Sequence, residues 1–155
     1  MNLIQTNLLR WLYWTDYGTV VRIERASMDG TSRTSLHTTE LSAPYGLTID
    51  YDTQILYWVD YTLDKLESSN VDGTNRTIVT RASIQCPWGI TFFEKKLYWG
   101  DTCQHIIYTS SVDAPNDVST LISTGDDPYR LHVVTSDRQP VFRMFMCDDD
   151  KLKIN

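Results

Sequence analysis

The sequence predicts an all-β fold, a partial β-propeller of about three blades in which each blade is a four-stranded antiparallel sheet. Two observations lead to this prediction. Three sequence markers recur in phase along the 155 residues, with a period of about 42 residues, and a period of this size is typical of propeller blades. Each period contains only short segments rich in β-branched and aromatic residues, bounded by Pro, Gly, Asp and Asn, and none keeps a helical pattern.

The first marker is Leu-Tyr-Trp-x-Asp, which begins at residues 12, 56 and 97. Its bulky side chains alternate onto both faces of a strand, which suits a sheet buried between two neighbouring blades. We therefore expect the aromatic residues to pack between blades, and each Asp to bond turn backbone or a neighbouring blade. These structural motif residues are Tyr13, Trp14, Asp16, Tyr57, Trp58, Asp60, Tyr98, Trp99 and Asp101.

The second marker is Asp-Gly-Thr-x-Arg, found at Asp29–Arg33 and Asp72–Arg76. Because glycine adopts positive φ without steric cost, Asp-Gly predicts a turn after the third strand. The apolar residues Ile23 and Met28 are five positions apart, and an unbroken strand would place them on opposite faces. We expect a β-bulge in the third strand of each blade; the alternative is that both faces of the blade are buried.

The third marker is a proline followed by an aromatic residue, at the start of the segment predicted to form the innermost strand of each blade. This arrangement would place an aromatic residue at one mouth of the propeller channel in every copy. Aromatic and arginine side chains are enriched at binding hot spots; the alternative is that each ring caps its own blade. The candidate ligand-binding residues are Tyr45, Trp88, Tyr129 and Arg130.

Composition and motif searches exclude several classes of function. A net charge of −6 argues against a nucleic-acid binder, and no apolar run reaches the roughly 18 residues of a membrane span. The sequence has no nucleophile elbow, P-loop or dinucleotide fingerprint. The histidines, His37, His105 and His132, are scattered, so we expect no zinc site, no other metal, no cofactor and no catalytic residue. Met1–Trp11 does not read as a signal peptide.

Tyr-Trp-Thr-Asp followed by Ile-Glu-Arg-Ala and Met-Asp-Gly resembles the YWTD (LDL-receptor class B) repeats of the low-density lipoprotein receptor family, which form six-bladed propellers. Leu12–Arg33 looks most like the LDL-receptor-related proteins, including the Wnt co-receptors. The resemblance implies a non-enzymatic, protein-ligand-binding module in the extracellular part of a single-pass cell-surface receptor. Its ligand would be a secreted factor or lipoprotein-type particle, bound for endocytosis or Wnt-type signalling.

One residue departs from the Wnt co-receptor pattern. Relatives of that type often have Asn at the position of Tyr45, where it grips an Asn-containing ligand peptide. Tyr45 cannot offer the same paired amide bonds.

The phase of the repeat suggests domain boundaries. Six periods would need roughly 250 residues, so the sequence is expected to cover about half of one propeller. Tyr129–Val134 resembles the closing strand of the family's propeller, and this resemblance implies the C-terminal half. Three explanations stay open: an incomplete gene model, a receptor fragment, or a half-propeller that pairs with a second copy to bury its exposed blade faces. The expected segments are an N-terminal lead-in 1–11, a partial blade 12–42, whole blades 43–85 and 86–126, a closing strand 127–134, and a tail 135–155 in place of an EGF-like module.

Two covalent features are expected. If Glu94-Lys95-Lys96 forms a hairpin turn, the residue count places Cys86 opposite position 103 or 104, which favours a Cys86–Cys103 disulfide over two free thiols. Cys147 would then lack a partner in this sequence. Asn75 begins the Asn-x-Thr sequon of the sequence, in a predicted turn where a secreted chain could be glycosylated.

Two other functions are compatible with a six-bladed propeller. Metal-dependent lactonases and esterases use this architecture, but they need several Asp, Glu or Asn side chains around a hard cation in the channel. A purely structural spacer is the second alternative.

Overall fold

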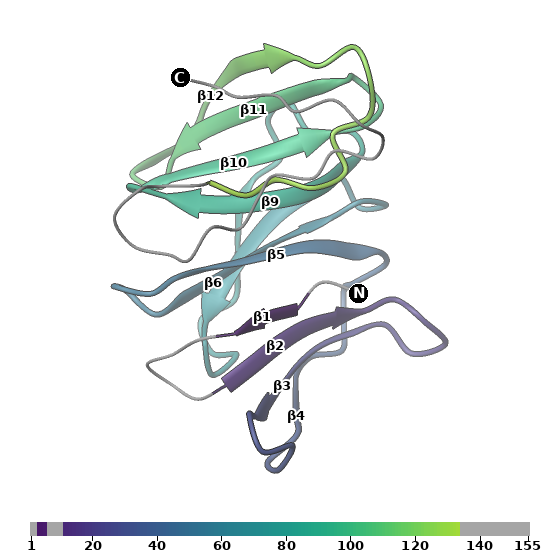
Figure 1. Cartoon of the computed structure of the whole chain (residues 1–155), viewed down its shortest axis with the longest axis vertical. Helices are drawn as coiled ribbons and strands as arrows, with labels where there is room; N and C mark the ends of the chain where they lie inside the picture. Colours follow the sequence, from purple (N-terminus) through teal and green to yellow (C-terminus); the bar gives the residue numbers. More distant parts are fainter. Residues whose placement is uncertain (1–2, 6–10, 134–155) are drawn as a thin grey trace.

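The computed structural model describes residues 3–5 and 11–133, which form three four-stranded antiparallel sheets (Figure 1). The first sheet contains β1(Leu3–Gln5), β2(Trp11–Asp16), β3(Arg22–Ser27) and β4(Thr34–His37). The second contains β5(Pro44–Asp50), β6(Ile55–Asp60), β7(Lys65–Asn70) and β8(Thr77–Thr80). The third contains β9(Pro87–Phe93), β10(Lys96–Asp101), β11(Ile106–Ser111) and β12(Ala114–Ser123).

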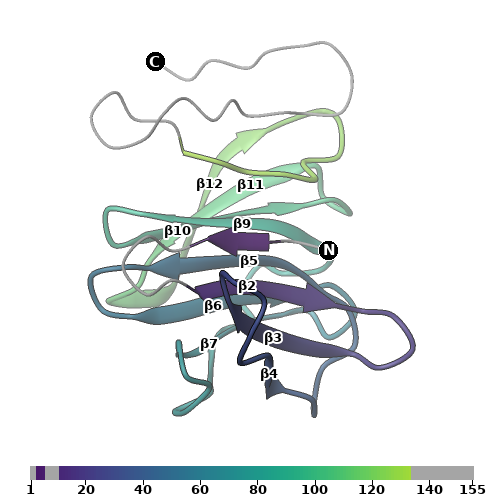
Figure 2. The ribbon, with the colours of Figure 1, turned by 60° about the horizontal axis from the view of Figure 1, so that its bottom comes forward.

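The three sheets stack face to face in chain order, with β9 beside β5 and β5 beside β2 (Figures 1 and 2). In each sheet the strands follow one another as a simple meander. Among the described residues no helix is long and apolar enough to cross a membrane. The predicted all-β partial propeller is therefore confirmed, and its three sheets are three blades.

The innermost strands β5 and β9 are each approached closely by a later chain segment at a glycine. A Cβ atom on Gly46 of β5 would lie 2.7 Å from the carbonyl oxygen of Trp88, and one on Gly89 of β9 would lie 2.8 Å from that of Tyr129. Real Cβ atoms do not come this close to backbone, so only glycine permits this packing. The aromatic residue before each glycine is thereby brought toward the next blade.

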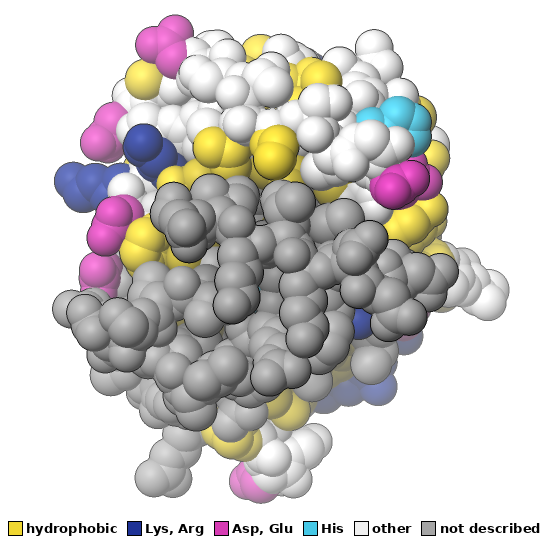
Figure 3. Space-filling model, turned by 45° about the horizontal axis from the view of Figure 1, so that its top comes forward, with side chains coloured by type: hydrophobic (Ala, Val, Ile, Leu, Met, Phe, Trp, Pro, Cys, Tyr) yellow, Lys and Arg dark blue, Asp and Glu magenta, His cyan; other side chains and the backbone are white. Residues whose placement is uncertain are grey.

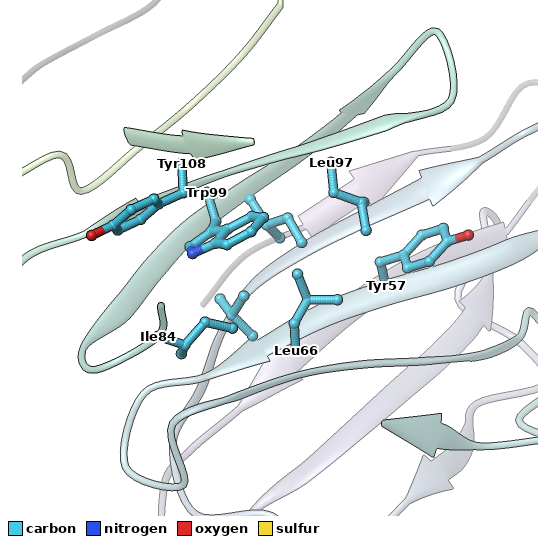
Figure 4. Close-up of a cluster of buried hydrophobic side chains, with 8 residues drawn as sticks. Tyr57, Leu66, Ile84, Leu97, Trp99 and Tyr108 are labelled. Atoms are coloured by element: carbon cyan, nitrogen blue, oxygen red, sulfur yellow. The ribbon is translucent and has the colours of Figure 1, made fainter. Parts of the chain in front are cut away.

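The core lies between the blades rather than within them. Tyr13, Leu56 and Trp58 are buried in the cluster between the first and second blades. The cluster between the second and third blades is shown in Figure 4 and contains Tyr57, Val59, Leu66, Ile84, Ile90, Leu97, Trp99 and Tyr108. The motif aromatics thus alternate between the two faces of each blade, which is why these strands carry bulk on both sides.

A buried ion pair supports the tryptophan of the second blade. Glu67 accepts hydrogen bonds from Nε and Nη2 of Arg76 at 3.1 and 2.9 Å and from the indole N–H of Trp58 at 3.2 Å. Arg76 also donates to the carbonyl oxygens of Thr39 and Glu40 in the segment leading from the first blade. The arginine of the second marker therefore connects its blade to the preceding one, because it donates hydrogen bonds to backbone carbonyl groups that lie outside the strands.

The first blade repeats this unit, and the third does not. Arg33 makes the same two-pronged contact with Glu24, at 3.1 and 2.7 Å, with its guanidinium 5.5 Å above the ring of Trp14. In the third blade Tyr108 stands at the glutamate position and stacks on Trp99 at 5.8 Å. The Trp99 indole nitrogen is buried without a hydrogen-bond partner.

In the first blade the β-bulge lies in the fourth strand and not in the third strand, where it was expected. The register between β2 and β3 is unbroken, and the shift lies between β3 and β4, where Leu36 is the extra residue. Met28 falls in the turn after β3 and is 46% exposed. In the first two blades the five-residue spacing therefore joins a strand residue to a turn residue, so no bulge in the third strand is needed there. In the third blade the pairing of β11 with β12 is irregular between Thr109 and Ser111. In the turn after β3, Gly30 has positive φ, as the Asp-Gly pair predicts.

Two boundary expectations also differ from the structure. β1 lies within the expected lead-in 1–11 and completes the first sheet, which was expected to be partial. A three-residue strand is too short to show a sequence period, but the open edge of β2 can still bond it. Residues 127–133 belong to none of the described sheets. Val134, Cys147 and the tail 135–155 lie outside the described residues.

A buried histidine contacts the first and second blades. Nε2 of His37, at the end of β4, lies 3.0 Å from the Ser69 hydroxyl, and the ring lies 4.9 Å from Trp58. Burial, reinforced by the positive charge of Arg76, lowers the pKa of His37 from 6.5 to about 4. The neutral ring is the form that fits this interface.

Replacing Glu67 by Gln is expected to lower the free energy of unfolding by about 3 kcal/mol, because it leaves Arg76 and the buried Lys65 without a counter-charge. Denaturant titration of the purified chain measures this loss. Glu94→Gln, in an exposed turn, is the matched control and should change stability by less than about 0.5 kcal/mol. A Glu67→Gln protein as stable as the control would contradict a stabilising role for the ion pair.

The free energy of unfolding should fall as the pH drops from 6.5 toward 4, because the unfolded chain protonates His37 over this range and the folded chain does not. The full shift corresponds to about 3 kcal/mol. His37→Gln should flatten this part of the stability profile, measured by denaturant titration at several pH values. An identical slope in the two proteins would show that His37 is not responsible.

Candidate ligand-binding site

Five aromatic rings from all three blades form a continuous surface cluster, here called the aromatic strip: Tyr17, Tyr45, Tyr61, Trp88 and Tyr129. The structure brings the three rings predicted from the third marker into one row. The ring centroids of Tyr45 and Trp88 are 4.1 Å apart, and those of Trp88 and Tyr129 are 5.0 Å apart. The rings therefore pack on one another across blades.

Two members of the aromatic strip, Tyr17 and Tyr61, were not among the residues predicted from the sequence. Tyr17 packs edge-on against Tyr45 at 4.7 Å, and Tyr61 lies 5.4 Å from Tyr45 and 5.6 Å from Trp88. Each follows directly after the aspartate of the first marker, so the signal was a Tyr in the same place of two repeats. The third repeat has the small residue Thr102 there, which makes the two ends of the aromatic strip different.

The aspartate of the second blade positions the neighbouring residues of the strip. Asp60 is fully buried and accepts the backbone N–H groups of Ser42 and Ala43 at 2.8 and 3.0 Å, just before β5. It also accepts the N–H groups of Thr62 and Leu63, in the turn after β6. One carboxylate thus holds the turn that carries Tyr61 against the start of the strand that carries Tyr45.

The third blade repeats this arrangement and adds a covalent bond. Asp101 accepts the N–H groups of Gln85 and Cys86 at 2.8 and 3.2 Å, and that of Gln104 at 3.0 Å. Cys86 and Cys103 form a disulfide with their Cα atoms 5.4 Å apart. The hairpin between β9 and β10 turns at Glu94 and Lys95, both with positive φ as in a type I′ turn. The bridge fixes the backbone two residues before Trp88.

In the first blade the carboxylate of Asp16 faces its own turn. It accepts the Gly18 N–H at 3.0 Å and contacts Arg22 at 3.4 Å. The Gly18 hydrogen bond holds the pKa of Asp16 below its ordinary value. The motif aspartates therefore stabilise turns and the segments between blades, because their carboxylates accept hydrogen bonds from backbone N–H groups.

The C-terminal end of the aromatic strip carries a polar network. The Tyr129 hydroxyl donates to Asp127 at 2.7 Å, and Nδ1 of His105 lies 2.9 Å from the other oxygen of that carboxylate. Arg130 is exposed beside Tyr129, outside the row of rings. Tyr129, Arg130 and Leu131 lie along Gly89 in the way that Trp88 and Ile90 lie along Gly46.

The chemistry of the aromatic strip suits recognition. Tyr17 is 48% exposed and Tyr129 37%, while the three central rings are half-buried. Burial, with the nearby Tyr17 and Tyr61 hydroxyls, raises the pKa of Tyr45, so the ring is neutral at physiological pH. Neutral phenol and indole edges offer apolar area together with hydrogen-bonding groups, the combination favoured at protein interfaces. Within 11–133, no three His, Cys, Asp or Glu side chains come together as metal ligands.

Comparison with known proteins identifies the repeat. Residues 10–51 and 54–94 match the low-density lipoprotein receptor repeat class B family. The chain is 38% identical over 129 residues to the vitellogenin receptor of Solenopsis invicta, and 34% identical over 98 residues to human low-density lipoprotein receptor-related protein 5. These alignments cover 83% and 63% of this chain but only 7% and 6% of those receptors.

Solved structures share the architecture. A chain of the nidogen/laminin complex superimposes with a TM-score of 0.74 at 35% identity, covering 79% of this chain and 48% of that one. A gluconolactonase from Xanthomonas campestris has a TM-score of 0.69 at 16% identity, covering 83% and 48%, a likeness of fold alone. This chain thus spans about half of each neighbour.

The family match agrees with the repeated Tyr-Trp-x-Asp strands and with the blade architecture. This chain therefore belongs to the low-density lipoprotein receptor class B (YWTD) repeat family, as a partial β-propeller of the LDL-receptor-related type.

Proposed function

We propose that this chain is part of an extracellular, non-catalytic module that binds a protein ligand on the aromatic strip, within a cell-surface receptor of the LDL-receptor-related type. The observation behind this proposal is the row of five rings that crosses all three blades on one side of a rigid scaffold. Large amphipathic rings held by backbone contacts bind with little loss of side-chain entropy. Tyr45, Trp88 and Tyr129 would supply the contact area, and the exposed Arg130 a charged contact at one end.

Relatives support the class of ligand. One relative is named for binding vitellogenin, and the nidogen chain was solved in a complex with laminin. A secreted or lipoprotein-type protein is therefore the class of partner that we propose here. Endocytic uptake fits the vitellogenin receptor, and Wnt-type signalling would fit the receptor-related protein, so both pathways stay within the proposal.

A hydrolase is the second candidate because the gluconolactonase shares the fold. The residues of this chain favour the binding function. The buried motif carboxylates of Asp60 and Asp101 each accept backbone N–H groups at both oxygens. These hydrogen bonds occupy lone pairs that a metal ion would otherwise share, which favours a structural role for the two carboxylates.

A structural spacer and a self-pairing half-ring are the remaining candidates. Self-pairing would bring the innermost strand of a second copy alongside β9. Tyr129–Leu131 of the same chain already lie along Gly89 at that place. We therefore favour ligand binding over self-association.

Alanine substitution of Trp88 is expected to weaken ligand binding at least about tenfold, because the ring contacts Tyr45, Tyr61 and Tyr129 at the centre of the strip. Binding would be measured by surface plasmon resonance with purified vitellogenin and laminin, and with peptides selected on the unmodified chain from a displayed random library. Tyr45→Ala and Tyr129→Ala should have smaller effects of the same sign.

Tyr51→Ala is the matched control, an exposed tyrosine after the other end of β5. It should leave the affinity unchanged. Equal affinities for the unmodified protein, Trp88→Ala and Tyr51→Ala would show that the aromatic strip is not the binding surface.

A further inference from the structure

We propose that Asn75 carries an N-linked glycan that covers the exposed side chain of Ile78 on the edge strand of the second blade. The inference rests on the proposed extracellular location and adds a modification site on the side of the blade away from the aromatic strip. Asn75 lies in the turn after β7, whereas Tyr61 lies in the turn before it. Six strand residues separate these turns, which is about 20 Å along a strand, so a glycan would leave the strip accessible.

The turn presents Asn75 in a defined conformation. Asp72 accepts the backbone N–H and the hydroxyl of Thr74 at 2.9 and 2.6 Å, and the Gly73 N–H donates to the Asn70 carbonyl at 2.9 Å. Asn75 itself is exposed and has a φ of 56°, the left-handed region that asparagine tolerates best among residues with a Cβ. The acceptor amide therefore projects from a rigid, accessible turn.

The first blade contains the same turn without the acceptor. Asp29 accepts the N–H and hydroxyl of Thr31 at 2.9 and 2.7 Å, and the Gly30 N–H donates to Ser27. Ser32 occupies the place of Asn75, with an identical φ of 56°, and is followed by Arg33 and Thr34. One substitution, Ser32→Asn, would thus complete a second sequon in the same geometry.

The edge strand next to Asn75 exposes an apolar side chain that a glycan could cover. β8 is the outermost strand of its sheet, and its second residue, Ile78, is 48% exposed. The corresponding residue of the first blade, which has no sequon, is the polar Ser35. Exposed apolar residues on edge strands promote association between chains, and a bulky hydrophilic sugar next to Ile78 would oppose it.

The test is expression of the full chain behind a cleavable secretion signal in insect cells, read on total cellular protein by the mass removed with peptide N-glycosidase. The unmodified chain should lose the mass of one glycan, Asn75→Gln and Thr77→Ala should lose none, and Thr77→Ser should behave like the unmodified chain. Ser32→Asn should carry two glycans. An unmodified chain without glycan, while Ser32→Asn carries one, would overturn the proposal, and so would a glycan that persists in Asn75→Gln.

The covering role is tested separately by light scattering of the secreted proteins. Asn75→Gln should aggregate at lower concentration than the glycosylated chain, and the double variant Asn75→Gln, Ile78→Ser should recover. Equal solubility of the glycosylated and Asn75→Gln proteins would overturn this role. Neither measurement uses a ligand, so failure of the glycan proposal is distinguishable from failure of the proposed binding function.

Discussion

The close approach of a later chain segment to Gly46 of β5 and to Gly89 of β9 is the constraint on which the binding surface depends. With backbone atoms of Trp88 and Tyr129 under 3 Å from the two Cβ positions, no other residue type fits there. The residues before these glycines, Tyr45 and Trp88, are consequently drawn together until their rings are 4.1 Å apart. The arrangement that joins the blades is therefore also the one that assembles the aromatic strip.

Polar groups buried between the blades make this joint rigid. Arg76 reaches from its ion pair with Glu67 to two carbonyls of the preceding blade, and His37 reaches from the first blade to Ser69 of the second. Such contacts are directional, so they fix the angle between neighbouring blades in a way that apolar packing alone does not. The third blade lacks the glutamate, and the Cys86–Cys103 disulfide instead ties its turn to the start of its innermost strand. The blades thus hold their parts of the strip by different interactions: ion pairs and hydrogen bonds in the first two blades, and hydrogen bonds with a disulfide in the third.

The repeat made most of the architecture predictable. The Leu-Tyr-Trp strands, the Asp-Gly turns and the Pro-aromatic segments recur in phase, and each has a local physical cause that acts within a few residues. The misplaced bulge shows the limit of this reasoning, because the spacing of Ile23 and Met28 does not reveal that Met28 lies beyond the end of β3. The short strand β1 has no period to detect, and it forms only because β2 offers a free edge.

The candidate site divides in the same way. Tyr45, Trp88 and Tyr129 could be identified from sequence because they hold the same place in three repeats. Tyr17 and Tyr61 hold one place in two repeats, but they join the strip through contacts between residues 16 to 28 positions apart, which no local pattern encodes. The sequence by itself therefore determined the blade, the family and the positions of three rings, since these follow from local propensity and repetition. Only the tertiary structure decided which rings touch and which carboxylates accept backbone hydrogen bonds, because these contacts depend on how the blades pack against one another.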